Sequence, residues 1–150
     1  MPGSYQRVLL HIVFSTHQRT PSLTPERRSR IFPYMGGLLR ELGCEFVMVN
    51  GFTDHAHVIC SLPVSHSLMD LVGKLKANSS KWIRRAVPDM EDFHWQTGYA
   101  AFSFSRKHLD AVCRYVQHQE SHHQKRTFEE EYRELLDLAG VPYEEQHLFA

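Results

Sequence analysis

The sequence lacks a long apolar run and has no paired cysteines. A membrane-spanning helix needs about 18 or more consecutive apolar residues, and no run approaches that length. Cys44, Cys60 and Cys113 are scattered, odd in number and show no Cys-x-x-Cys spacing, which argues against a disulfide framework or a zinc knuckle and indicates a reducing compartment. The first residues contain no basic leader followed by a small-residue cleavage site, so we expect no signal peptide and a cytoplasmic location.

The chain also lacks net charge, because 17 Lys and Arg residues balance 17 Asp and Glu residues. The charges are nevertheless unevenly distributed. Residues 1–126 hold 16 basic against 10 acidic residues, whereas residues 127–150 hold one Arg against seven acidic residues. The body of the protein is therefore basic and its tail acidic, which keeps a nucleic-acid partner open. No internal repeat divides the 150 residues, and we expect one domain over residues 1–150.

Hydrophobic periodicity predicts a sheet of four strands. The expected strands cover residues 5–16, 44–50, 54–62 and 99–105, and the expected helices cover 25–42, 67–87, 107–123 and 127–138. Asn50-Gly51 is typical of a hairpin turn between the second and third strands. The βαββαβ order predicts a ferredoxin-like α/β (α+β) fold with an antiparallel sheet. Its core spans about residues 5–105, followed by additions at 107–123 and 127–150.

Two histidines stand out in the third predicted strand, Asp54-His55-Ala56-His57. Alternate residues of a strand share a face, so His55 and His57 present two imidazoles side by side. Two neutral imidazoles at this spacing form half of a metal site. Asp54 is expected to be a turn residue, with support of a histidine as the alternative. His11 is expected to be a hydrogen-bonded core histidine.

The predicted helix at 107–123 carries Tyr115 and Gln119, which share a helix face at i and i+4. If this helix crosses the histidine strand, Gln119 can supply an oxygen ligand and Tyr115 lies against whatever group the metal holds. A tyrosine hydroxyl is a poor nucleophile at neutral pH, but a divalent metal that polarises a phosphodiester makes it useful. Imidazole and amide ligands suit Mg²⁺ or Mn²⁺, and Mn²⁺ matches the nitrogens better.

These features resemble the single-tyrosine HUH transposases, the TnpA proteins of small insertion sequences and their REP-associated relatives. The resemblance runs nearly end to end, over His11–Thr16, Leu39–Cys44, Asp54–His57, Lys76–Trp82, Trp95–Tyr99, Tyr115–Gln119 and Thr127–Tyr132. It departs from the family pattern at Ala56, which is usually bulkier, and at His118, which is more often Asn.

The resemblance implies that His55, His57 and Gln119 hold the metal. It implies that Tyr115 attacks a phosphate of single-stranded DNA, stays joined to the 5′ end and frees a 3′ hydroxyl, so that rejoining needs no ATP. It further implies recognition of DNA hairpins near element ends, a homodimer, and a bacterial or archaeal cytoplasm.

Basic residues offer candidate contacts to DNA phosphates, which supply most of the affinity of such proteins. The candidates are Lys74, Lys76, Lys81, Arg84 and Arg85 on the second predicted helix, and Arg106 and Lys107 at the start of the third. His122 and His123 are expected to be exposed. The acidic helix at 127–138 is expected to be solvated, to face another subunit or to dock on the basic body.

Three other functions are compatible with the sequence alone. A domesticated relative would process repeated palindromes with the same chemistry. An RRM-like protein would bind nucleic acid without catalysis, and a small regulatory protein of this fold would bind metal without binding DNA.

Overall fold

The computed structural model describes residues 3–150, and its centre is a four-stranded antiparallel sheet in the order β2-β3-β1-β4. The strands are β1 (Leu9–Ser15), β2 (Val47–Gly51), β3 (His55–Ser61) and β4 (Ala100–Phe104). β1 and β3 are the two inner strands, and β1 pairs with both β3 and β4. This order and direction confirm the ferredoxin-like fold predicted from the sequence.

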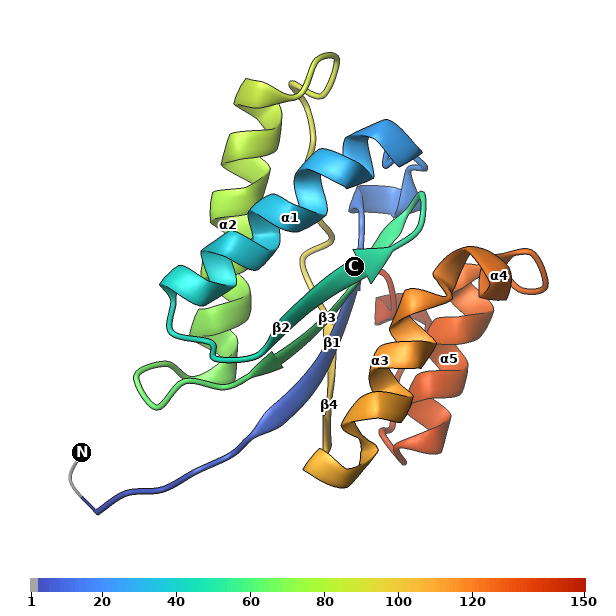
Figure 1. Ribbon diagram of the computed structural model, residues 1–150. Helices are drawn as coiled ribbons and strands as arrows, with labels where there is room; N and C mark the ends of the chain where they lie inside the picture. Colours follow the sequence, from blue (N-terminus) through green and yellow to red (C-terminus); the bar gives the residue numbers. More distant parts are fainter. Residues whose placement is uncertain (1–2) are drawn as a thin grey trace.

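Helices cover both faces of the sheet (Figure 1). The longer helices α1 (Pro25–Glu41) and α2 (Leu68–Ala86) lie on one face, and α3 (Leu109–Gln117) and α5 (Phe128–Leu138) lie on the other. A short α4 (Gln119–His123) connects these last two. No helix in the described part of the chain is both long and apolar enough to cross a membrane.

Side chains that alternate along β1 and β3 divide the interior into two apolar clusters. Ile12, Phe14 and Val58 belong to the cluster beneath α1 and α2. Val13 belongs to the cluster beneath α5, together with Phe128. Because every residue of β3 is buried, its polar side chains need partners inside the protein, since a buried polar group without a hydrogen bond destabilises the fold.

Local sequence signals set the ends of the helices. The Thr24 and Ser67 side chains accept hydrogen bonds at the starts of α1 and α2. The predicted capping box is present at the start of α5, where Thr127 and Glu130 bond each other's backbone amides. α5 therefore begins where its sequence requires, and this fixes which of its residues face the sheet.

Two predicted boundaries are wrong. The helix expected over 107–123 breaks at His118, whose φ of −101° and ψ of 33° are not helical. Asn50-Gly51 is not the hairpin turn, because both residues still pair with β3, opposite His57 and Ala56. Gly51 serves close packing instead: a Cβ there would overlap the carbonyl oxygen of His55 and crowd Phe32.

We expect Gly51→Ala to lower the free energy of unfolding by about 1–3 kcal/mol, because the added methyl meets backbone that cannot move aside. Gly73→Ala is the matched control: it lies within α2 with open space around its Cβ position and should stabilise by about 0.5–1 kcal/mol. Urea denaturation measures both changes. Equal effects of the two variants would contradict the packing assigned to Gly51.

Candidate active site

β3 places His55 and His57 on the sheet face beneath α3 and α5, and both side chains are fully buried. Each ring is held through its Nδ1 atom. His55 Nδ1 lies 2.8 Å from Asp54 Oδ1, and His57 Nδ1 lies 2.8 Å from His11 Nε2 on β1. Asp54 thus supports a histidine, and His11 is a hydrogen-bonded core residue as expected.

These partners determine which ring nitrogen faces the interior of the site. The Asp54 carboxylate can only accept, so His55 donates from Nδ1. Burial, with a contribution from His57, lowers the pKa of His11 to about 3, so His11 is neutral, and its hydrogen bond with Nδ1 holds the His57 ring in place. Both metal-binding candidates therefore direct Nε2 toward the same point, an arrangement that commonly orients histidine ligands.

Glu131 of α5 occupies that point. Its carboxylate is fully buried, and Oε1 lies 3.3 Å from His57 Nε2, 3.4 Å from His55 Nε2 and 3.1 Å from His123 Nε2. Burial alone would raise the pKa of the Glu131 carboxyl, but hydrogen bonds with the three histidines lower it far below its usual range. A carboxylate buried in this way remains ionised because its partners compensate for the lost hydration.

Tyr115 and Gln119 reach the same cluster from α3 and α4. Gln119 Oε1 lies 3.0 Å from His55 Nε2. The Tyr115 hydroxyl donates to Glu131 Oε2 and accepts a 3.2 Å hydrogen bond from Arg126 Nη2. Burial and the Glu131 charge raise the pKa of Tyr115 well above its usual value, so the phenol is protonated at neutral pH.

The donor set fits a divalent metal ion. His55, His57 and Glu131 each offer one ligand atom, and these atoms lie within 4.8 Å of one another. Two imidazole nitrogens and a carboxylate oxygen suit Mn²⁺, and Mg²⁺ less well. Gln119 is adjacent and can add an amide oxygen. When bound, the metal would polarise a phosphodiester as a Lewis acid.

Sequence reasoning missed Glu131 and placed His123 wrongly. His123 is not exposed: its side chain is 3% accessible, stacks on Phe52 and lies against Glu131 and Gln119. The acidic helix was expected to be solvated or docked, yet Glu131 falls between Phe128 and Tyr132 on its buried side. An acidic residue on the apolar face of a helix is the signal that indicates a buried, partnered carboxylate.

The basic residues predicted to contact DNA fall into different environments. Lys76 and Arg84 bind backbone carbonyls of residues 93–98 and so hold the loop before β4. Lys74, Lys81 and Arg85 are exposed on α2, on the opposite side of the sheet from α3 (Figure 1). Arg106 and Lys107 are exposed immediately before α3.

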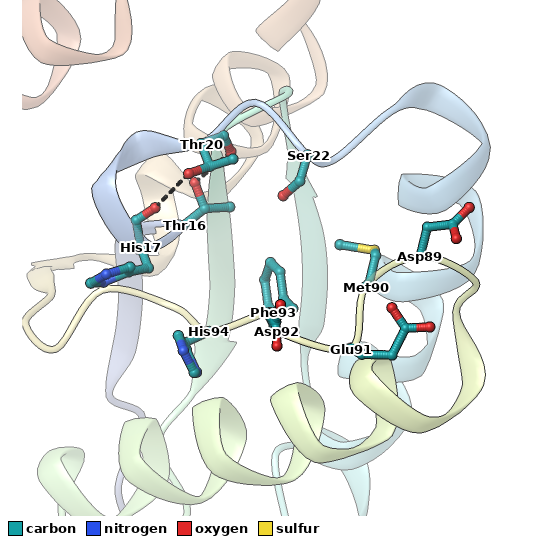
Figure 2. Close-up of a pocket in the computed structure, with 10 residues that line it drawn as sticks. All are labelled: Thr16, His17, Thr20, Ser22, Asp89, Met90, Glu91, Asp92, Phe93 and His94. Atoms are coloured by element: carbon teal, nitrogen blue, oxygen red, sulfur yellow. Dashed lines mark hydrogen bonds between the residues drawn. The ribbon is translucent and has the colours of Figure 1, made fainter.

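Two cavities differ in their relation to this cluster. One, of about 440 Å³, is lined by residues 52–54 and 123–130, including Asp54, His123 and Arg126, and so borders the cluster. The other, of about 280 Å³, lies between the segment after β1 and the loop before β4 (Figure 2). Asp89, Glu91 and Asp92 line this second cavity, so its charge does not favour phosphate.

Comparisons with known proteins give consistent results. The family described as "Transposase IS200 like" matches residues 4–119. A proposed transposase from Deinococcus radiodurans has a similar structure, with 19% identity and a TM-score of 0.65 over 79% of this chain and 95% of that one. A REP-associated tyrosine transposase bound to a REP hairpin is similar at 13% identity and a TM-score of 0.57, over 81% and 74%. These identities show a shared fold. No curated protein matches the chain.

Mn²⁺ should stabilise the folded protein through the three donor residues. At about 100 times its Kd, a ligand specific for the folded state adds about 2.7 kcal/mol to the free energy of unfolding. We expect His57→Ala and Glu131→Gln to remove most of this gain, and Asp137→Asn, an exposed carboxylate on the same helix, to retain it. Thermal unfolding with Mn²⁺ or EDTA measures the effect. A full gain in Glu131→Gln would exclude Glu131 as a ligand.

Acid should destabilise the metal-free protein through His11. Its pKa in the folded state is about 3, against 6.5 as the ordinary value, so the unfolded state binds more protons between these values. The free energy of unfolding therefore falls as the pH drops below 6.5. His11→Gln keeps a hydrogen-bonding side chain but does not titrate, so its stability should fall less between pH 7.5 and pH 5. Identical losses in urea denaturation with EDTA would contradict this role.

Proposed function

Because this chain belongs to the IS200-like transposase family, we propose that it cleaves and rejoins single-stranded DNA through a 5′-phosphotyrosine at Tyr115. The hydrogen bond of the Tyr115 hydroxyl is the main support for this proposal. The Tyr115 hydroxyl is hydrogen-bonded to the carboxylate that contacts both His55 and His57. A nucleophile, a general-base candidate and a divalent-metal site therefore meet within one cluster, a combination that promotes phosphoryl transfer.

The residues have distinct roles in this mechanism. His55, His57 and Glu131, with Gln119 beside them, would hold Mg²⁺ or Mn²⁺, which polarises the scissile phosphate when bound. The Tyr115 oxygen forms a bond to phosphorus while the bond to the 3′ oxygen breaks. Glu131 Oε2 accepts the hydrogen bond of the phenol and so receives its proton, and the departing 3′ oxygen takes a proton from solvent water. Reversal of these steps rejoins the strand.

We propose that the site works within a single chain. The contacts among Tyr115, Glu131 and the two histidines are all made by one copy of the protein. A homodimer remains our expectation for holding two DNA ends, but the partner would not need to supply the tyrosine. The proposed substrate is single-stranded DNA beside a hairpin, since a structurally similar transposase is described as bound to a REP hairpin.

Mixing two inactive variants tests assembly within one chain. Tyr115→Phe and His57→Ala should each form no covalent adduct, and an equimolar mixture should form none either. If the tyrosine came from the partner subunit, mixed dimers would carry one intact site and adduct would reappear. Adduct formation is measured on denaturing gels with a labelled strand and Mn²⁺.

The proposed function is tested by the covalent product itself. Labelled single strands from the DNA flanking the gene are incubated with the protein and Mn²⁺ or Mg²⁺. We expect a denaturant-resistant protein–DNA band that needs metal, Tyr115 and His57, and that is lost with EDTA. DNA binding without any such band would favour the non-catalytic binding protein, and absence of DNA binding would contradict the transposase function.

A further inference from the structure

Arg126, in the loop between α4 and α5, contacts the atom that the proposed function makes reactive. Its Nη2 donates to the Tyr115 hydroxyl at 3.2 Å, and its Nη1 pairs with the Glu134 carboxylate on α5. The Arg126 side chain is 22% accessible and Glu134 is 52% accessible. The guanidinium thus lies at the surface end of the buried cluster, where a DNA strand can approach it.

The two partners of the Tyr115 hydroxyl have opposite charge. Glu131 accepts its hydrogen bond and disfavours negative charge on the oxygen, whereas Arg126 favours that charge. Among the residues that the structure describes, Arg126 is the one cationic side chain hydrogen-bonded to this oxygen. Negative charge must develop there when the phenol attacks, and a fixed positive charge aimed at a developing anion stabilises the transition state.

We propose that Arg126 is a catalytic residue that binds the Tyr115 oxygen and the scissile phosphate together. This inference rests on the proposed function. One N–H of the guanidinium stays on the tyrosine oxygen while it forms its bond to phosphorus. The phosphate replaces the Glu134 carboxylate on the other branch, because a planar fork of donors matches phosphate as well as carboxylate. The bond to the 3′ oxygen breaks, the phenol proton passes to Glu131, and solvent water protonates the 3′ oxygen as it leaves.

Glu134 has a defined part in this arrangement. It pairs with the guanidinium branch that the phosphate would use and so keeps Arg126 directed at Tyr115. Ion pairs near the protein surface contribute little to stability, so a phosphate can displace Glu134 at little cost. The loop neighbour Lys125 is exposed and provides a control with the same charge but no place in the mechanism.

The test compares Arg126→Ala, Arg126→Lys and Lys125→Ala in single-turnover formation of the covalent adduct, with a labelled single strand from the flanking DNA and Mn²⁺. We expect Arg126→Ala to be slower by about 10²–10³-fold, the usual effect of removing one donor to a developing anion. Arg126→Lys should be intermediate, since it keeps the charge but loses the fork. Lys125→Ala should react at nearly the wild-type rate.

Four further readouts distinguish a catalytic role of Arg126 from a structural one. Mn²⁺ binding and thermal stability of Arg126→Ala should match the wild type, and its DNA affinity should change only a few-fold. Added guanidinium should accelerate Arg126→Ala and leave the wild type unchanged. Two results would overturn the role of Arg126 while leaving the proposed function intact. One is that Arg126→Ala forms the adduct as fast as the wild type. The other is that Arg126→Ala forms the adduct slowly, is less stable than the wild type and is not rescued by guanidinium. If the wild type forms no adduct, the proposed function fails and this role fails with it.

Discussion

The candidate site depends on one buried carboxylate. Glu131 is fully buried, so the stability of its charge depends on His55, His57, His123 and the Tyr115 hydroxyl. Removing the partners of a buried charge is far more costly than disturbing a surface pair. The same contacts dock α5 against the sheet and bring α3 and α4 over β3. Folding of the C-terminal helices and assembly of the site are therefore coupled, and a metal ion at this point would satisfy the same charge.

The sheet itself orients the two histidines of the site. β3 is an inner strand, so alternate residues support two separate cores, and Ala56 and Val58 pack beneath α1 and α2 while His55 and His57 face α5. Asp54 and His11 fix both rings through Nδ1. The imidazoles are oriented by the framework and do not have to be ordered by the metal, which lowers the entropic cost of forming the site.

The sequence alone predicted the fold and half of the cluster, because the periodicity of strands and helices determines which residues share a face. Alternation placed His55 and His57 on one face, and the spacing of Tyr115 and Gln119 brought both residues to the histidines even though the helix breaks between them at His118. Glu131 was not predicted, because its burial depends on how α5 packs against the sheet. Helical periodicity shows only that Glu131 lies near Phe128 and Tyr132 on one side of the helix. Gly51 was assigned to a turn because Asn-Gly is a local signal, whereas its role is a close contact with backbone across the hairpin.

The most direct measurement is the identity of the residue that carries DNA after reaction. Digestion of the covalent product with trypsin and nuclease, followed by mass spectrometry, locates the attached 5′-phosphonucleotide. We expect the nucleotide on the peptide of residues 115–125, which follows Arg114, ends at Lys125 and contains Tyr115 as its one tyrosine. Attachment at another residue, or a metal-dependent cleavage that leaves no nucleotide on the protein, would contradict the claim that Tyr115 is the nucleophile of this site.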